Sequence, residues 1–318
     1  MSDGLLILGF GGPTPGCCQR RPTCVPGPGC EATCFVSGIL GDDPSKADRV
    51  AEVVGHYQHL GGFSPYNQLT ERQVAALQAG LTRHGCALPV ALGYRHWSPW
   101  ALDAVRALKE AGCREPALLI LSVHQSSVGW NDYISLAASA CAQVGGLRVS
   151  QVITPWFDDP AYAQAIAEQV AHATCDWDAE RAAAAALVFT AHAIPAPAEA
   201  RSPYRRQVEI TAALAARACG RDSHHLAFQS QPSLSRVPWS RPSVTETLAQ
   251  LAASGVRDVI LQPCGFLVDH VEVLFDLDHE AKAEAQRLGL GFARAACVND
   301  QAIFIDLLVQ RALAAFRA

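Results

Sequence analysis

The sequence predicts an α/β protein made of two similar doubly wound, Rossmann-like domains, each with a four-stranded parallel sheet. Short apolar runs alternate with longer stretches of helical period, which is the pattern of βα units. The two halves also echo each other, because each opens with an apolar strand that ends in a proline-containing turn, GFGGP in one and TAHAIP in the other. In such folds ligands bind at the carboxyl ends of the strands, so we expect the site in a cleft between the halves.

Eight strands are expected, four in each half, at residues 5–10, 88–94, 116–123, 147–154, 186–191, 224–230, 256–263 and 289–296. Helices are expected at 45–59, 70–85, 99–111, 129–144, 160–174, 203–219, 243–254 and 271–288, with a closing helix at 301–316. Prolines in first turns and glycines just after last turns, such as Pro160 and Gly255, support these bounds. We expect an N-terminal domain over 1–150, a C-terminal domain over 151–300 and a closing segment over 301–318.

Composition excludes several classes of protein. With 25 Lys+Arg against 30 Asp+Glu the formal net charge is -5, which argues against a nucleic-acid binder with a basic surface. The longest apolar run, 182–191, has about half of the ~20 residues that a membrane span needs. The N-terminal apolar stretch is too short for a signal peptide. We therefore expect a cytoplasmic protein without a transmembrane segment, and leave open a peripheral contact with a membrane.

The chain has twelve cysteines, of which five fall within residues 17–34. The other seven are scattered singly, as small buried side chains usually are. The group comprises Cys17, Cys18, Cys24, Cys30 and Cys34, with prolines and glycines between them. It predicts a loop that holds a metal, with unpaired surface thiols as the alternative. Zinc signatures pair their cysteines as C-x2-C, and this run lacks such pairs.

Glycines follow the first strand at Gly9, Gly11 and Gly12. Neither GxGxxG nor GxxxxGK[ST] is present, and Pro13 stands where a nucleotide-binding helix would begin. The pattern therefore favours a tight turn that lets the backbone approach a ligand, rather than a nucleotide site.

His192 stands at the carboxyl end of the strand that opens the second half. Its neighbours Ala191 and Ala193 are small and would leave the imidazole ring accessible in the expected cleft. A histidine satisfied by local contacts at a strand end is the alternative. We favour a functional role, because imidazole changes its charge near neutral pH.

Three carboxylates, Glu272, Asp276 and Glu280, follow the strand at 256–263 with spacings of four. In an α-helix they share one face and drift by only ~40° per step, and by less if the turn widens to a π-type bulge. A solvated acidic face is the alternative. Because apolar residues surround the row, we favour a hydrated path for cations or protons, with some carboxyl pKa values raised by burial and mutual repulsion.

Aromatic and polar residues gather at the other expected strand ends, in 94–100, 122–127, 155–160 and 228–239. Aromatic residues in such loops often belong to the local core. Several of them on one face predict instead a pocket for a large, flat, apolar ligand.

Four ordered segments resemble one family, the ferrochelatases, which insert ferrous iron into a porphyrin in haem synthesis. The segments are HYQHLGGFSPYNQLTERQ, VFTAHAIP, FQSQPSLSRVPW and GFLVDHVEVLFDLD, and the closing VNDQAIFIDLL is also similar. The resemblance covers nearly the whole chain and implies a chelatase-like fold and an enzyme of the lyase class. Porphyrin and Fe²⁺ are then the substrates.

The resemblance also implies roles for single residues. His192 matches the active-site histidine of the family and Glu272 its partner carboxylate, and both are expected to meet the Fe²⁺ substrate. Asp276 and Glu280 match the acidic row behind them, as a proton or metal relay. The expected porphyrin contacts are Phe10, Tyr57, Ser64, His124 and Phe157. We expect neutral His192 to accept pyrrole protons, since its ordinary pKa lies near 6.5.

The sequence departs from the family in three places. Phe10 stands where some bacterial relatives carry an iron-ligating tyrosine. Ser127 replaces one cysteine of the 2Fe-2S cluster that many relatives hold, and the three C-terminal cysteines of that cluster are missing from the sequence. The cysteine-rich run replaces a charged helix. We therefore expect a relocated 2Fe-2S cluster there, ligated by Cys24, Cys30 and Cys34 with Cys17 or Cys18.

Coproporphyrin III is favoured over protoporphyrin IX as substrate, because the SPYN and VPW segments look closer to bacterial relatives that use it. A cobalt or nickel chelatase of related fold is the alternative among enzymes. A non-catalytic carrier of tetrapyrrole or metal is the alternative of another class, although a carrier has no need of an acidic row that faces a histidine.

Overall fold

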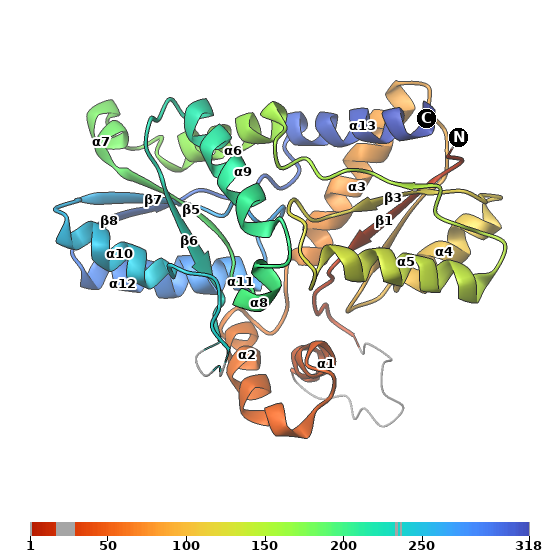
Figure 1. Cartoon of the computed structure of the whole chain (residues 1–318), viewed down its shortest axis with the longest axis horizontal. Helices are drawn as coiled ribbons and strands as arrows, with labels where there is room; N and C mark the ends of the chain where they lie inside the picture. Colours follow the sequence, from red (N-terminus) through yellow and green to blue (C-terminus); the bar gives the residue numbers. More distant parts are fainter. Residues whose placement is uncertain (1, 17–28, 233–234, 236, 318) are drawn as a thin grey trace.

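A computed structural model of the chain describes residues 2–16, 29–232, 235 and 237–317 (Figure 1). They form two four-stranded sheets in which every strand pair is parallel. The first sheet has the order β2-β1-β3-β4. Its strands are β1 (Leu5–Gly9), β2 (Val90–Tyr94), β3 (Ala117–Ile120) and β4 (Gln151–Val152).

The second sheet repeats this arrangement in the order β6-β5-β7-β8. Its strands are β5 (Ala186–His192), β6 (His225–Gln229), β7 (Asp258–Gln262) and β8 (Gly291–Arg294). All eight expected strands are present, and the predicted pair of parallel α/β sheets is confirmed.

The helices of the first half are α1 (Cys30–Ile39), a 3₁₀ turn (Pro44–Lys46), α2 (Ala47–His59), α3 (Tyr66–Arg83), α4 (Ala101–Glu110) and α5 (Trp130–Val144). Those of the second half are α6 (Pro160–Ala173), α7 (Ala179–Ala184), α8 (Ala196–Glu199), α9 (Tyr204–Ala218), α10 (Val244–Ala253), α11 (Val271–Val273), the π-helix η2 (Leu274–Ala281), α12 (Lys282–Arg287) and α13 (Ala302–Arg317). Every expected helix is present.

Three helices were not predicted: α1, α7 and α8. The prediction that 17–34 is a loop is wrong for its last part, because α1 begins at Cys30. Gly29 precedes it with a φ of 78°, a left-handed conformation that glycine adopts without steric cost. The glycines and prolines of this run gave no helical pattern in the sequence. The short helix α1 packs against α2.

The apolar strands are explained by burial on both faces of each sheet. In β1, Leu5 and Ile7 belong to a core that also includes Leu187 and Phe189 of β5, so this core continues from one half into the other. The opposite face of the first sheet packs against α4 and α5. That of the second sheet packs against α10, the π-helix and α12.

The closing helix α13 joins the two halves, since it packs against α3 and α6 (Figure 1). The chain passes between the sheets after β4. Because Gln151–Val152 still pairs with β3, a division by sheets falls after Val152 rather than at 150. The exact domain bounds stay a prediction.

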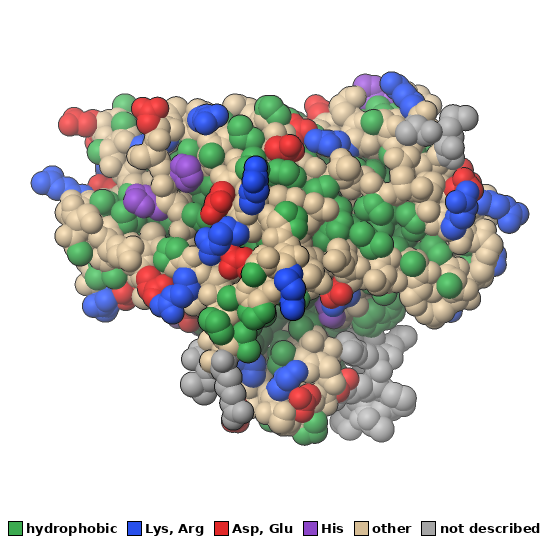
Figure 2. All heavy atoms as spheres, viewed as in Figure 1, with side chains coloured by type: hydrophobic (Ala, Val, Ile, Leu, Met, Phe, Trp, Pro, Cys, Tyr) green, Lys and Arg blue, Asp and Glu red, His purple; other side chains and the backbone are tan. Residues whose placement is uncertain are grey.

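Helices α1 and α2 form a lobe beneath the two sheets (Figure 1). Phe35 and Val36 of α1 pack with Val54 of α2 in a small apolar cluster, which also takes in Trp97 and Val271. Val271 begins α11, so this cluster attaches the lobe to the second half. Figure 2 shows a hollow where the lobe meets the body of the molecule.

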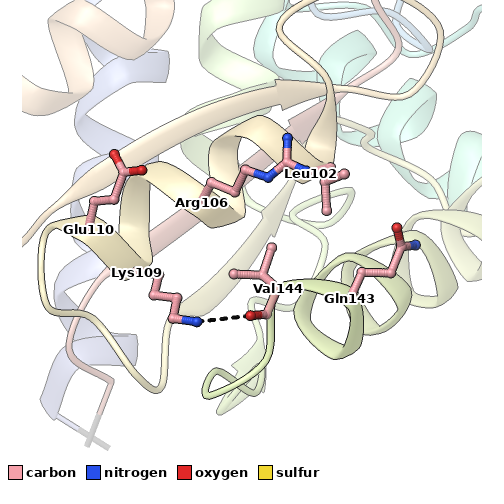
Figure 3. Close-up of a pocket in the computed structure, with 6 residues that line it drawn as sticks. All are labelled: Leu102, Arg106, Lys109, Glu110, Gln143 and Val144. Atoms are coloured by element: carbon pink, nitrogen blue, oxygen red, sulfur yellow. Dashed lines mark hydrogen bonds between the residues drawn. The ribbon is translucent and has the colours of Figure 1, made fainter.

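A small surface pocket lies away from the strand ends, between α4 and α5 (Figure 3). Its cations are already engaged: Arg106 pairs with Asp103, and Lys109 Nζ donates to the Val144 carbonyl at 2.9 Å. This pocket therefore offers a ligand little unpaired charge. No helix in the described part of the chain has the length and apolar character that crossing a membrane requires.

Candidate active site

His192 is the last residue of β5, and hydrogen bonds fix both its backbone and its ring. Ala191 and Ala193 on either side are buried, while the histidine side chain is 34% exposed. The Tyr204 hydroxyl on α9 donates to the His192 carbonyl at 2.7 Å. The ring itself is hydrogen-bonded through Nδ1 to the Ala193 carbonyl. Since a carbonyl only accepts, Nδ1 carries the proton of the neutral ring and Nε2 is left as a free base.

Glu272 is brought to this base by the loop after β7. A Cβ at Gly265 would lie 2.8 Å from the Cβ of Ala191, so only glycine lets the loop pass this close to the end of β5. His270 caps the N-terminus of α11, and its Nδ1 accepts the backbone N–H of Glu272 at 3.2 Å. Glu272 Oε2 lies 3.6 Å from His192 Nε2, and its side chain is 37% exposed. The base and the carboxylate thus face each other across a gap that solvent reaches.

The acidic row continues along a π-helix, which is the wider helical turn that the sequence analysis considered. Leu274–Ala281 has π geometry and contains Asp276 and Glu280. A π-helix has more residues per turn than an α-helix, so steps of four drift less around it. On another side, Asp278 binds the Arg294 guanidinium through both oxygens, at 2.8 and 2.6 Å. This ion pair ties the π-helix to β8.

Asp276 sits behind the His192–Glu272 pair, against the end of β6. Ser230 Oγ donates to its Oδ2 at 2.5 Å and Gln229 Nε2 does so at 3.4 Å. The pKa of Asp276 is raised to about 8, first by burial and then by the charges of Glu272 and Glu280, while the two hydrogen bonds offset part of the rise. A carboxyl with this pKa can bind and release a proton near neutral pH.

Glu280 lies at the outer end of the row. Its pKa is raised, first by burial and also by the charge of Glu52 on α2, while His279 acts in the opposite direction. The row of carboxyls thus runs from the exposed Glu280, near the lobe, to Glu272, which faces His192 at the end of β5. A histidine, a facing carboxylate and two further carboxyls with raised pKa values together suit the deprotonation and metallation of a ligand.

Comparison with known proteins shows the family to which the chain belongs. The sequence profile of the ferrochelatases matches residues 44–315. The chain belongs to the ferrochelatase family. The coproporphyrin III ferrochelatase of Mycolicibacterium smegmatis is 35% identical over 311 residues, which are 96% of this chain and 88% of the relative. That of Mycobacterium marinum is 36% identical over 312 residues, 96% of this chain and 84% of the relative.

Solved structures of low sequence identity share the fold. SirB from Bacillus subtilis with Fe³⁺ has a TM-score of 0.56 at 13% identity, over 76% of this chain and 87% of that one. The sirohydrochlorin chelatase SirB from the subspecies spizizenii, in complex with cobalt, has a TM-score of 0.52 at 16% identity over the same shares. The chelatase-like fold inferred from the ferrochelatase resemblance is thereby confirmed.

Phe10 lies at the end of β1 and is one of the most exposed large apolar side chains, at 36%. Its ring packs against His96 with centroids 4.6 Å apart. Its backbone N–H donates to the Tyr66 hydroxyl at 2.9 Å, and the Tyr66 ring in turn lies 6.0 Å from that of His270. Tyr66 therefore connects the exposed phenylalanine of the first half to the helix start that carries Glu272.

Four other residues that the ferrochelatase resemblance places at the porphyrin are largely covered by protein. Tyr57 is buried in the lobe beside Phe35. Ser64 is buried under the glycine turn, where its N–H donates to the Pro13 carbonyl at 3.0 Å. Phe157 packs against the shared core.

His124 is fully enclosed and bridges the two halves. Its Nε2 lies 3.0 Å from the hydroxyl of Thr211 on α9, which donates to the Phe157 carbonyl at 2.7 Å. Because that hydroxyl proton is used, Nε2 of His124 is the donor. Burial lowers the pKa of His124 to about 3, so the ring stays neutral. This histidine holds the loop after β3 onto α9.

The candidate cysteine ligands are only partly within the described residues. Cys17, Cys18 and Cys24 lie outside them. Cys30 begins α1 and is partly exposed, whereas Cys34 one turn later is buried in the apolar cluster of the lobe. Among the residues that the structure describes, no three His, Cys, Asp or Glu side chains are placed to hold a metal ion.

Three residues at the site had no role in the sequence-based hypothesis: Gln229, Ser230 and His270. All three lie inside segments that resemble the ferrochelatases, and this resemblance is the feature of the sequence that could have identified them. Gln229 is fixed by the Thr190 hydroxyl, which donates to its Oε1 at 2.8 Å. Ser230 has a φ of 63°, a conformation that costs about 1–3 kcal/mol in a non-glycine residue. In this conformation the Ser230 hydroxyl donates to Asp276.

Proposed function

We propose that this member of the ferrochelatase family inserts Fe²⁺ into coproporphyrin III, a lyase reaction of haem synthesis. The observation that carries the proposed chemistry is the 3.6 Å pairing of His192 Nε2 with Glu272 at the head of the acidic row. The choice of porphyrin is supported by the relatives named coproporphyrin III ferrochelatases, which align with 96% of the chain.

Metallation breaks two pyrrole N–H bonds and forms bonds from iron to the four nitrogens, with release of two protons and of the water bound to Fe²⁺. Nε2 of His192 accepts a pyrrole proton, because Nδ1 is occupied by the Ala193 carbonyl. Glu272 stabilises the imidazolium that results. Asp276, with a pKa of about 8, passes protons on to Glu280 and solvent and returns His192 to its neutral form.

Fe²⁺ enters this reaction as a substrate. The carboxylate of Glu272 and the imidazole of His192 are both ligands that suit it, before His192 takes up a proton. Such donors bind Cu²⁺ and Zn²⁺ at least as well, so the choice of metal depends on availability and on the geometry of the ring. Phe10 packs on the face of the macrocycle, while Tyr57, Ser64, His124 and Phe157 shape the walls.

Steady-state insertion of Fe²⁺ under anaerobic conditions, with each of the two porphyrins, tests the proposal. We expect kcat/KM to be at least roughly tenfold higher for coproporphyrin III than for protoporphyrin IX. Equal or reversed preference would refute the choice of porphyrin. Insertion of Co²⁺ or Ni²⁺ but no Fe²⁺ would favour the other chelatase, and tight binding without metallation would favour a carrier.

A 2Fe-2S cluster at the N-terminal cysteines stays a prediction that rests on their spacing and on the family resemblance. If Cys24, Cys30 and Cys34 ligate it with Cys17 or Cys18, anaerobically purified protein is reddish-brown and contains about two irons per chain. Colourless protein free of iron would remove the cluster. A cytoplasmic location, with or without peripheral membrane contact, also stays a prediction, and cell fractionation checks it.

A further inference from the structure

Arg294 is the last residue of β8, and its guanidinium joins two parts of the segment that carries Glu272. Its side chain is only 14% exposed. Nε and Nη2 donate to the two oxygens of Asp278 in the π-helix, at 2.8 and 2.6 Å. Nη1 donates to Asp269 Oδ1, in the loop before α11, at 2.7 Å. One guanidinium thus binds residues 269 and 278, on either side of Glu272.

Asp269 in turn is held by Asn299 and leads directly to the start of α11. Its Oδ2 accepts a hydrogen bond from Asn299 Nδ2 at 2.9 Å, and its backbone N–H donates to Asn299 Oδ1 at 3.1 Å. The next residue, His270, caps α11 and accepts the backbone N–H of Glu272. A fixed Asp269 therefore fixes the cap from which Glu272 reaches toward His192.

Gln73 of α3 connects this network to the first half of the molecule. Its side chain is buried, and Nε2 donates to the carbonyls of Asn299 at 2.7 Å and of Leu267 at 3.2 Å. The Asn299 N–H also donates to the Leu267 carbonyl, at 2.9 Å. The loop after β7 is therefore held from α3 as well as from β8, which leaves it little freedom to shift Glu272.

The arrangement depends on the shape of the arginine side chain as well as on its charge. A planar guanidinium has donors in a fixed fork, so it can bind one carboxylate through two nitrogens and a second carboxylate through the third. Lysine keeps the positive charge, but its ammonium is a single point that cannot reproduce this fork. Replacement of Arg294 by lysine therefore tests geometry while it preserves charge.

We propose that Arg294 is a positioning residue for the reaction, which holds Glu272 opposite His192 without touching the substrate. The inference rests on the proposed iron insertion and adds to it the residue that fixes the 3.6 Å pairing of Glu272 with His192. The competing explanation is that the two ion pairs only fasten β8 to the π-helix and stabilise the fold. Kinetics separate the two explanations, since a positioning role changes kcat specifically.

The first experiment measures kcat and both KM values in wild type, Arg294→Lys and Asp278→Asn. Asp278 is 38% exposed, so its variant should fold even if the substitution of the more buried arginine does not. The matched control is Arg181→Lys, because Arg181 binds Asp258 through two nitrogens, at 2.9 and 2.7 Å, at the amino end of β7 in the same sheet. The control should keep the wild-type values.

We expect kcat to fall about tenfold in Arg294→Lys and about threefold in Asp278→Asn, with the porphyrin and Fe²⁺ KM values within about twofold of wild type. Loss of kcat reports a displaced carboxylate, because substrate binding does not require the exact alignment that proton transfer does. Wild-type kcat in both variants would overturn the positioning role. An equal loss in Arg181→Lys would do so too.

Combination with Glu272→Gln shows whether Arg294 acts through that carboxylate. Two residues that act together give non-additive effects when both are changed. In the Glu272→Gln background, Arg294→Lys should lower the remaining kcat by less than about twofold, because the carboxylate that it positions is already gone. The same tenfold loss in both backgrounds would show that Arg294 acts elsewhere and would overturn the proposal.

Hydrogen exchange tests the positioning without the reaction. Peptides from residues 266–281 should exchange about tenfold faster in Arg294→Lys than in wild type, while peptides from β5 keep their protection. Unchanged exchange in 266–281, or a rise of equal size throughout the chain, would overturn the proposal. If wild type inserts iron into neither porphyrin but 266–281 alone loosens, the positioning of Glu272 by Arg294 stands and the proposed function fails.

Discussion

The ends of β1 and β5 occupy the same position in two sheets of the same strand order, yet they differ in chemistry. After β1 the chain makes a glycine turn that leaves the ring of Phe10 partly exposed. Its backbone is held by α3, where the Asn67 side chain accepts the N–H of Gly12 at 2.8 Å. After β5 the chain presents His192, and Tyr204 of α9 holds the backbone instead.

The difference shows how one fold builds two unlike walls. The doubly wound sheet brings the end of its central strand to the site in both halves. The residue at that end then decides whether the wall offers an apolar surface or a base. The asymmetry suits the proposed reaction, in which one wall would contact the flat porphyrin ring and the other would remove protons from its centre. Four predictions test this division, beginning with the largest expected effect.

Removal of the base should have the largest effect. His192→Ala and Glu272→Gln should each lower kcat for iron insertion by about 100-fold or more, because proton transfer in the reaction step is lost. Both side chains are about one-third exposed, so the fold should persist. Steady-state rates and circular dichroism check this. Near wild-type turnover in either variant would remove the proposed role.

The second prediction concerns the close approach of Gly265 to Ala191, which brings the loop after β7 to His192. Gly265→Ala should cost about 1–3 kcal/mol of stability and reduce turnover, because the new Cβ would lie 2.8 Å from Ala191 and push the loop away from His192. Gly55→Ala is the matched control, since nothing lies within 4 Å of a Cβ at that helical position. Urea unfolding and kcat measure both variants. Equal stability and equal kcat in the two variants would contradict the proposed role of the close approach at Gly265.

The third prediction concerns the proton row behind His192. The folded chain keeps a proton on Asp276 up to a pH of about 8, whereas the unfolded chain loses it near 3.8. Between these values the folded state binds the extra proton, so rising pH removes this contribution to stability. Asp276→Asn should therefore lessen the loss of stability from pH 4 to 8 and lower kcat without raising the porphyrin KM.

Urea midpoints at several pH values, together with turnover, check that prediction. A stability profile that follows wild type would show that Asp276 ionises normally. A rise in the porphyrin KM alone would make the row a wall of the pocket rather than a relay.

The smallest effect is expected at the apolar wall. Phe10→Ala should raise the porphyrin KM by roughly threefold to tenfold with little change in kcat, because a ring contact of about 0.5–1.5 kcal/mol is lost. Phe10→Tyr keeps the ring and should bind the porphyrin nearly as wild type does. Substrate titrations of both variants check this, and a wild-type KM in Phe10→Ala would exclude the contact.

Strands and helices were predictable where a short stretch of sequence carries its own pattern of apolar and polar residues. Apolar runs such as Leu5–Gly9 predicted strands, because both faces of these sheets are buried and no polar alternation interrupts them. Helix α3 begins at Tyr66, four residues before the expected start, with Pro65 at the N-cap position. This part of the chain was interpreted as a site motif. The short helix α1 has no comparable sequence pattern and depends on its contacts with α2.

The roles of single residues were less predictable. His124 lies at a strand end, as His192 does, and both were assigned to the site. Only the fold shows that His124 bonds to Thr211, 87 residues away, and is enclosed. Sequence position indicates that a side chain reaches the carboxyl edge of a sheet, and it does not indicate whether another element covers that side chain.

The sequence by itself determined the two parallel sheets, the histidine at the end of β5 and the three carboxylates on one helical face. These depend on periodicity and spacing along short stretches of chain. The tertiary structure decided that His192 Nε2 is the free nitrogen, that Glu272 lies 3.6 Å from it and that the pKa of Asp276 rises to about 8. Hydrogen-bond partners and desolvation come from elements that are distant in the chain, here β6, α9 and the loop after β7, and only folding brings them together.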